Sequence, residues 1–387
     1  MPSPELQILL CCAKVETPEN RKIQLLELIP QISNWETVVN LANHHGLIPL
    51  AHLRMKESVW AYLPKDACQA LEIRHRANAT HSLSLTSELL RVMQLLQGQN
   101  IFALPYKGPV LATQLYGDVA MRQYGDIDVV IHKEDWSKVD TLLKSDGWKI
   151  DFNLTPAQEK YFQEGYNVHT YFSSRRDVAL EIHWAFAQPL SSFSLVLQSV
   201  HTSLKMLEIS GSKLPVPIPE ELLFILCFHG TKHKWERLGW LTDVAYLLTI
   251  YPTLDWQRVY LLAEKYRLKR ALKTMLCLLH SINGVMLLPE IYADVFSDPR
   301  AVKLAKEIEQ LIHQHPIEEE GYISDRIYLK LRENWRDRFA YFFYSFLKTI
   351  PADWELIPYK IPRSLFFLYY PARLIRLLRK HILHENI

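Results

Sequence analysis

The sequence predicts an α+β protein in which a small mixed sheet with its own helices lies between two helical regions. Apolar residues recur at i, i+3 and i+4 spacing towards both ends of the chain, and the middle carries short runs of period two. Only 12 of the 387 residues are glycine, which favours helices joined by few tight turns. We expect an N-terminal helical region at 1–85, a core at 86–210 and a C-terminal helical domain at 211–387.

The N-terminal region has a helical pattern from about residue 4 to about residue 97. Asn34 stands directly before Trp35, which is typical of a helix N-cap, and Gly46 followed by Pro49 is typical of a helix stop. The last of these helices therefore leads into the core.

The core alternates short strands with helical segments. The glycine turn Lys107-Gly108 opens one expected helix, and 133–148 is amphipathic and predicts another. The expected strands are 101–106, 126–132, 148–152, 168–174 and 178–186. This order indicates a small mixed sheet backed by helices.

A proline-spaced segment, KLPVPIPEELL at 213–223, follows the core, and we interpret it as a linker. Helical periodicity then continues to the end of the chain. The expected helices are 219–232, 237–250, 255–265, 268–282, 300–313 and 324–349.

Composition excludes several classes of protein. A hydrophobic fraction of 49% argues against extended disorder, and a net charge of +2 argues against a protein that coats a nucleic-acid duplex. Five cysteines without CxxC spacing argue against a disulfide framework and a thiolate zinc site. No stretch reaches the roughly 20 apolar residues of a spanning helix. We therefore expect a cytoplasmic protein.

The C-terminal tail, 364–387, is basic, aromatic and amphipathic. Two interpretations follow from this composition. The tail either docks on the protein through its Leu, Ile and Tyr face with Arg and Lys in solvent, which we favour, or lies on an anionic membrane surface.

Three carboxylates stand on two of the expected strands. Asp126 and Asp128 alternate with apolar residues and so share one face of their strand, and Glu181 alternates in the same way on a later strand. If these strands are neighbours, the three carboxylates converge and repel one another. Divalent metal relieves this repulsion, although DxD pairs also occur on solvated strand edges without any function.

Magnesium suits such a cluster because it prefers hard oxygen ligands and bridges carboxylates to phosphates. Two ions about 3.5–4 Å apart stabilise the attacking and leaving oxygens of phosphoryl transfer. Lys107 and Gly108 lie where a strand turns into a helix and Arg122 precedes the Asp pair, so these residues are candidates for holding phosphates.

These motifs carry a family resemblance. YKGPVLATQLYGDVAMRQYGDIDVVI (106–131) followed by LEIHW (180–184) resembles the polymerase-beta-type nucleotidyltransferases. More narrowly, it is similar to a bacterial group of uncharacterised nucleotidyltransferases, and so are the segments at 34–50, 228–248, 351–358 and 368–378. The chain departs from the wider superfamily at the glycine turn, where Lys107-Gly108-Pro109 replaces Gly-Ser or Gly-Gly.

The resemblance implies a polymerase-beta-like nucleotidyltransferase core and transfer of a nucleoside monophosphate, AMP from ATP, to a small-molecule, peptide or protein acceptor with release of pyrophosphate. Two Mg²⁺ ions are implied, with Mn²⁺ as a substitute. Asp126, Asp128 and Glu181 would hold the metal, and Glu181 could also take the acceptor's proton. The residues implied in nucleotide binding are Lys107, Gly108, Arg122 and His183.

A second group lies past the core. His229, His233 and Arg237 are spaced i, i+4 and i+8, so on one helix they form a stripe, with Trp240 near the same direction. We expect this cationic and aromatic stripe to bind the nucleotide or the acceptor. Asp243 would either orient one of the basic groups or form a simple helix-packing ion pair. Interior histidines are the alternative. A zinc site completed by His183 or Cys227 is less favoured because no acid has metalloprotease spacing.

Two other functions stay open. A phosphotransferase would use the γ-phosphate on the same scaffold. A nucleotide-binding protein without turnover would have no need of the three acids, so their presence argues against it.

Overall fold

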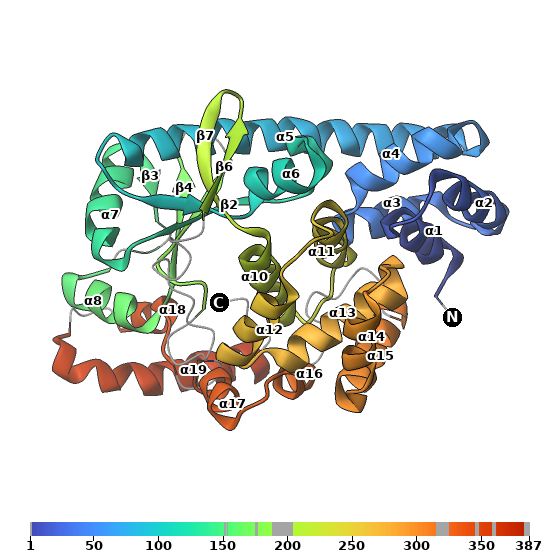
Figure 1. Ribbon diagram of the computed structural model, residues 1–387. Helices are drawn as coiled ribbons and strands as arrows, with labels where there is room; N and C mark the ends of the chain where they lie inside the picture. The colour runs from blue at the N-terminus through green and yellow to red at the C-terminus, as the bar shows by residue number, and fades with distance from the viewer. Residues whose placement is uncertain are drawn as a thin grey trace.

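The structure is a computed structural model, and it describes residues 2–150, 152, 154–174, 177–187, 204–314, 325–344, 348–357 and 361–382. A small sheet lies beside one end of the long helix α5 (Lys65–Gln97), and helices make up most of the rest (Figure 1). This arrangement confirms the α+β class. The three-part division stays a prediction, and α5 runs across its first boundary at residue 85.

Local capping starts the N-terminal helices. Asn34 Oδ1 accepts a hydrogen bond from the backbone N of Glu36 at 2.9 Å, which confirms the predicted N-cap. Gly46, just past the end of that helix, has the positive φ of a helix stop, +71°. The helices before α5 are α1 (Pro4–Ala13), α2 (Pro18–Leu28), α3 (Trp35–His44) and α4 (Ile48–Ser58).

The sheet contains the five predicted strands in the order β1-β2-β5-β4-β3. β2 and β5 are parallel neighbours, and every other neighbouring pair in this sheet is antiparallel. The strands are β1 (Ala103–Pro105), β2 (Asp126–Ile131), β3 (Trp148–Lys149), β4 (Val168–Ser173) and β5 (Ala179–His183). The parallel pair is the feature that later positions the site.

Three helices accompany this sheet. Helices α6 (Gly108–Tyr116) and α7 (Trp136–Ser145) fall in the segments predicted to be helical. Helix α8 (Pro156–Gly165) has no counterpart in the prediction, although its capping box at Thr155 and Gln158 is a recognisable helix start. Leu85, Leu89 and Leu96 on the second half of α5 are fully buried in the same core as the apolar side chains of β2.

The predicted linker is partly wrong. Residues 213–217 belong to a hairpin of β6 (Leu204–Ile209) and β7 (Ser212–Pro217). Pro215 and Pro217 are two residues apart, so both occupy the same kind of position in the ladder. In a two-stranded sheet alternate positions face the outer edge, where a missing N–H costs nothing.

The C-terminal helices largely follow the predicted ranges. The predicted helix 324–349 is wrong, because Asn334 breaks it into α16 and α17: its Oδ1 caps α17 by accepting from Asp337 N at 2.9 Å. The helices are α10 (Pro219–Lys232), α11 (Leu238–Ile250), α12 (Trp256–Lys265), α13 (Lys269–Asn283), α14 (Pro289–Phe296), α15 (Pro299–Gln314), α16 (Asp325–Leu331), α17 (Trp335–Phe342), α18 (Pro351–Glu355) and α19 (Tyr369–Ile382).

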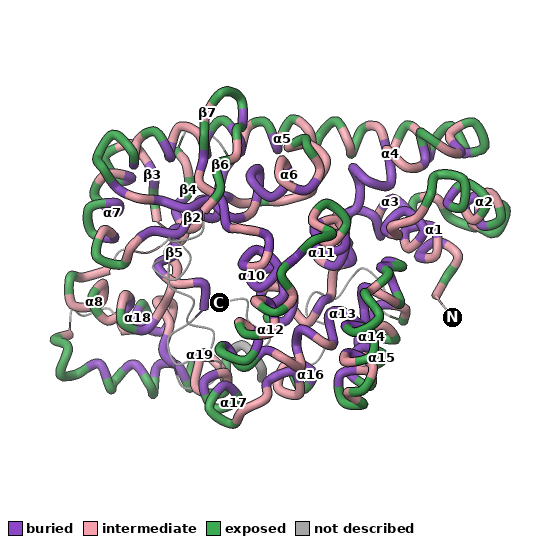
Figure 2. The backbone as a smooth tube through the Cα atoms, viewed as in Figure 1, coloured by how far each residue is buried: buried purple, intermediate pink, exposed green. Residues whose placement is uncertain are grey.

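The N-terminal and C-terminal helices share one hydrophobic core, and α10 is buried along most of its length (Figure 2). Asn283 on α13 is fully buried and bonds the end of α1, with its Nδ2 3.0 Å from Ala13 O. The helical segments at the two ends of the chain therefore pack directly on each other.

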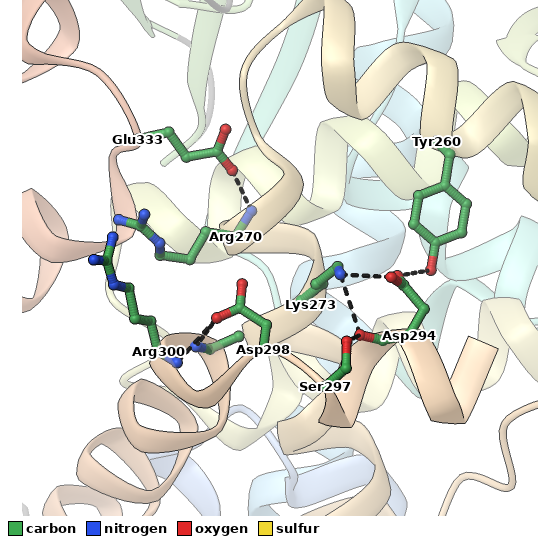
Figure 3. A network of polar contacts seen from close by, with 9 residues as sticks. Tyr260, Arg270, Lys273, Asp294, Ser297, Asp298, Arg300 and Glu333 are labelled. Atoms are coloured by element: carbon green, nitrogen blue, oxygen red, sulfur yellow. Dashed lines mark hydrogen bonds and ion pairs between the residues drawn. The ribbon is translucent and has the colours of Figure 1, made fainter. Parts of the chain in front are cut away.

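Polar contacts link α12, α13 and α14 and connect α13 to the segment that follows α16 (Figure 3). Asp294 accepts from Lys273 Nζ at 2.7 Å and from Tyr260 OH at 2.8 Å, and Glu333 accepts from the backbone N of Arg270. These contacts fix neighbouring helices to one another.

Helix α19 does not dock as predicted. Arg373 and Arg376 are buried and paired with the buried Asp353, at 3.2 and 2.6 Å, whereas Leu374 and Leu378 are 61% and 56% exposed. The buried Asp353 carboxylate explains why the orientation is opposite to the expected one. Leaving this charge without a positive partner would cost more free energy than exposing leucine side chains to solvent. Residues 383–387 of the predicted tail lie outside the described residues. Across the described chain, no helix has both the length and the apolar character needed to cross a bilayer.

Candidate active site

The parallel pairing of β2 and β5 brings two predicted carboxylates together. In the register of this pair Asp128 lies opposite Glu181, and Asp126 lies opposite Ala179. Side chains two residues apart on a strand share a face, so all three acids lie on one side of the sheet. Sequence spacing predicts which side chains share a face of each strand. The pairing of β2 with β5 brings the acids of the two strands together.

His183 lies between two of these acids. Its Nε2 is 3.1 Å from Asp128 Oδ1 and 3.1 Å from Glu181 Oε2. Burial alone would lower the pKa of His183, but the hydrogen bonds and charges of the two carboxylates raise it above its ordinary value. The same contact with His183 lowers the pKa of Glu181. The imidazolium form therefore joins two ionised carboxylates.

Asp128 is almost inaccessible, at 2% exposure. Its Oδ1 accepts from Tyr106 OH and from Lys107 Nζ, both at 3.3 Å. Burial raises the pKa of Asp128, but the positive charge of Lys107 and the bond from His183 outweigh it and hold this pKa below its ordinary value. Asp128 is therefore a carboxylate at neutral pH.

Asp126 is in a different electrostatic state. Burial, and then the charge of Asp128, raise the pKa of Asp126 to about 6, although Lys107 opposes this shift. Two carboxylates of one DxD pair therefore titrate far apart, and Asp126 is the one that takes up a proton in weakly acidic solution.

The glycine turn approaches the strand closely. Gly108 has φ +53°, and a Cβ placed on it would lie 3.1 Å from the backbone O of Asp126. Both facts require glycine at this position. No side chain caps this start of α6. Pro109 has no N–H and Val110 N donates to Lys107 O at 3.2 Å, so the backbone N–H of Gly108 is the candidate donor to a ligand.

Arg122 is engaged with the C-terminal region. Its Nε lies 2.9 and 3.1 Å from the two carboxylate oxygens of Asp243, and Tyr116 OH donates to the same group at 2.9 Å. Asp243 therefore forms an ion pair, which is one of the two roles expected for it, and its partner is Arg122. The contact of Arg122 with a triphosphate stays a prediction.

The loop 117–125 before β2 is held from several elements. Asn78 of α5 donates to the backbone O of Ala120 at 2.8 Å, and Gln123 Oε1 accepts from Ile48 N of α4 at 2.8 Å. Together with the Arg122–Asp243 pair, these bonds tie the approach to Asp126 to both helical regions.

The predicted single-helix stripe of His229, His233 and Arg237 is wrong. Helix α10 ends at Lys232, and the chain turns at Lys234 and Trp235, both with positive φ. Packing imposes this turn: the fully buried Trp235 ring lies where a Cβ on Gly230 would sit, 2.3 Å away.

The turn nevertheless gathers the same side chains. The His229 and His233 rings lie 5.2 and 5.1 Å from the Trp240 ring, and the Arg237 guanidinium lies 5.7 Å from it. Burial is the main cause that lowers the pKa of both histidines, that of His233 to about 3. They are neutral near pH 7, so the positive charge expected from them is absent and Arg237 supplies it.

Two further residues near the acids were not predicted from the sequence. Tyr106 reaches Asp128 only through tertiary packing. Lys232 lies in the fields of Lys107, Glu181 and Asp128, and desolvation together with Lys107 lowers its pKa. It follows His229 by three residues, which is the one hint that it faces the same side.

The donor set fits a divalent cation. Asp128, Glu181 and His183 each offer a ligand atom within 4.8 Å of the others, and within the described ranges no other group of three His, Cys, Asp or Glu does so. The two carboxylates suit Mg²⁺ or Mn²⁺, whereas the imidazole of His183 is a poor ligand for Mg²⁺. The zinc alternative at His229 and His233 gains no third ligand among these residues.

Residues 32–284, more than half of the chain, match a family model described as uncharacterised nucleotidyltransferase. No curated protein matches the chain significantly.

Solved structures give weak likenesses. The antibiotic-resistance factor ANT(2'')-Ia is 15% identical over 49% of this chain and 92% of its own, with a TM-score of 0.35. The lincomycin-bound lincosamide antibiotic adenylyltransferase LnuA is 18% identical over 42% and 96%, at 0.28. An antigenic nucleotidyltransferase-like protein from Paracoccidioides brasiliensis is 18% identical over 51% and 91%, at 0.29. At such scores, the family match and the geometry of the site carry more weight.

Proposed function

Because this chain belongs to the uncharacterised nucleotidyltransferase family, whose model its residues 32–284 match, we propose that it transfers AMP from ATP to an acceptor and releases pyrophosphate. The membership confirms the resemblance seen in the sequence motifs and the nucleotidyltransferase core expected from it. The proposed acceptor is a small molecule, a peptide or a protein side chain.

One observation supports the proposal most: three acids on adjacent strands next to a glycine turn. Asp128 and Glu181 are neighbours across the β2–β5 pair, and a Cβ on Gly108 would lie 3.1 Å from the backbone O of Asp126. Such a cluster is costly in a folded protein unless positive charge balances it. Bound metal would supply that charge and would also attract the phosphates of a nucleotide.

The proposed roles follow from position. Asp126, Asp128 and Glu181 would hold Mg²⁺, and His183 would yield its place between the carboxylates. Bound Mg²⁺ would neutralise the acids and the phosphates. Lys107, the N-terminus of α6 at Gly108, and Lys232 lie beside the acids and would hold the β- and γ-phosphates.

In the transfer step an acceptor hydroxyl oxygen bonds to the α-phosphorus, and the bond from that phosphorus to the α–β bridging oxygen breaks. The hydroxyl proton passes to the Glu181 carboxylate, and pyrophosphate leaves with the electron pair of the broken bond. Positioning and charge stabilisation account for most of the rate in such reactions.

A labelling experiment tests the proposal. The protein is incubated with Mg²⁺, candidate acceptors and ATP labelled at the α- or the γ-phosphorus, with EDTA as control. Transfer of the α label supports the proposal. Transfer of the γ label identifies a phosphotransferase, and nucleotide binding without transfer of either label identifies a non-catalytic protein.

Metal binding should weaken in acid. Because the pKa of Asp126 is about 6, protons compete for this ligand as the pH falls through 6, and the proton on His183 competes in the same direction. We expect Mn²⁺ affinity to fall about tenfold or more from pH 7 to pH 5. Titration followed by electron paramagnetic resonance measures this, and equal affinity at both values would refute the assignment of Asp126.

The proposed location is the cytoplasm. All five cysteines are free thiols, which suits a reducing compartment.

A further inference from the structure

A cavity of about 670 Å³ lies next to the acids, where the two helical regions meet the core. Its walls come from the segment between α3 and α4, from α5, from the loop before β2 and from the start of α11. Arg122 and Gly125 line it directly before Asp126, so the cavity approaches the site from the N-terminal end of β2.

One face of α5 forms a wall of this cavity. The lining residues Arg74, Ala77, Asn78 and His81 are spaced i, i+3, i+4 and i+7, which is one helical stripe. Arg74 is exposed there, and it makes no hydrogen bond or ion pair with any residue that the structure describes. An arginine held on a cavity wall without a protein partner is a ready ligand for an anion.

The charge of the lining has the same sign. The described lining residues include three arginines, Arg74, Arg122 and Arg237, and one carboxylate, Asp243. Asp243 is already bonded to Arg122. The cavity is therefore positive overall.

The side chains that surround Asp128 lie outside the cavity lining. Lys107, Lys232 and Glu181 do not line the cavity, although Lys107 bonds Asp128. Trp240 lines the cavity and also contacts the His229 and His233 rings. In-line transfer requires the acceptor and the departing pyrophosphate on opposite sides of the α-phosphorus.

We propose that this cavity binds the acceptor and that the acceptor carries an anionic group, phosphate or carboxylate, held by Arg74. This inference rests on the proposed nucleotidyl transfer for the identity of the second reactant. Arg74 holds the anion in the forked geometry of a guanidinium, and His81, on the same stripe, offers a further hydrogen bond.

Anion binding tests this inference without turnover. Inorganic phosphate and, separately, acetate are titrated calorimetrically into protein saturated with Mg²⁺ and a non-hydrolysable α,β-methylene analogue of ATP. We expect Arg74→Gln to weaken the preferred anion tenfold or more and to leave analogue affinity within twofold. Arg76→Gln is the matched control, because Arg76 lies outside the cavity lining on the same helix and pairs with Glu72.

Each outcome decides the inference. Arg74-dependent binding of an anion alongside the analogue supports it, and the stronger of the two anions identifies the acceptor group. Competition between anion and analogue would assign the cavity to the nucleotide and overturn it, as would no binding at 50 mM or equal loss in both variants. Failure of the analogue to bind would instead refute the proposed function, while Arg74-dependent anion binding could still be observed.

Discussion

Asp128→Asn should abolish nucleotidyl transfer, with a loss of about 10³-fold or more. Because Asp128 is buried and paired with Lys107 and His183, the change should also lower the melting temperature, although it relieves the repulsion between Asp128 and the neighbouring carboxylates. The change removes the charge that Lys107 and His183 share and that the proposed metal requires, but no core volume. A 10³-fold loss corresponds to about 4 kcal/mol of transition-state stabilisation. Steady-state kinetics and thermal unfolding measure the two effects separately, and Asp126→Asn should lose activity alike.

Asp177→Asn is a suitable control, since Asp177 is an exposed aspartate two residues before β5. It should retain normal turnover. If Asp128→Asn kept activity within tenfold of the original protein, the assignment of the DxD pair to metal binding would be wrong.

Asp243→Asn should destabilise the protein by about 3–5 kcal/mol, the range found when one partner of a buried ion pair is removed. The side chains of Arg122 and Asp243 are only 11% and 3% exposed, so the guanidinium would lose its counter-charge without gaining water. The Tyr116 hydroxyl would also lose its ionised acceptor. Urea unfolding measures the change in free energy.

Two comparisons separate this effect from a general loss of charge. Glu264→Gln breaks the exposed pair with Lys269 and should cost less than about 1 kcal/mol. Replacing both partners, Arg122→Met with Asp243→Leu, should recover much of the lost stability. A loss below about 1 kcal/mol for Asp243→Asn would show that water reaches the pair.

Several features of the site are local and therefore readable from the sequence. Alternation along a strand places Asp126 and Asp128 on one face whatever lies beside that strand. The Asn34 cap is local in the same sense, and so is the glycine turn at Gly108, which joins a strand to a helix. The motifs built on them also carried the family resemblance.

Pairing across long separations was decided by the tertiary structure. Glu181 meets Asp128 only because β5 adds to β2 in one register, and a slip of one residue would turn its side chain to the other face. The bridging role of His183 follows from the same register. Sequence spacing could place His183 on the correct face but could not name its two partners.

Turns and buried charges set the remaining positions. The Trp235 ring packs on Gly230 and ends a helix that sequence periodicity alone would continue. Asp353 pairs with two arginines of α19, so these arginines are buried although the amphipathic pattern predicts them in solvent. The periodicity of a sequence shows which side chains share one face of a single helix or strand. The cost of burying a ring or a charge depends on partners from distant segments, so only the folded chain determines how Arg122 meets Asp243 and how Arg74 comes to line a cavity beside the acids.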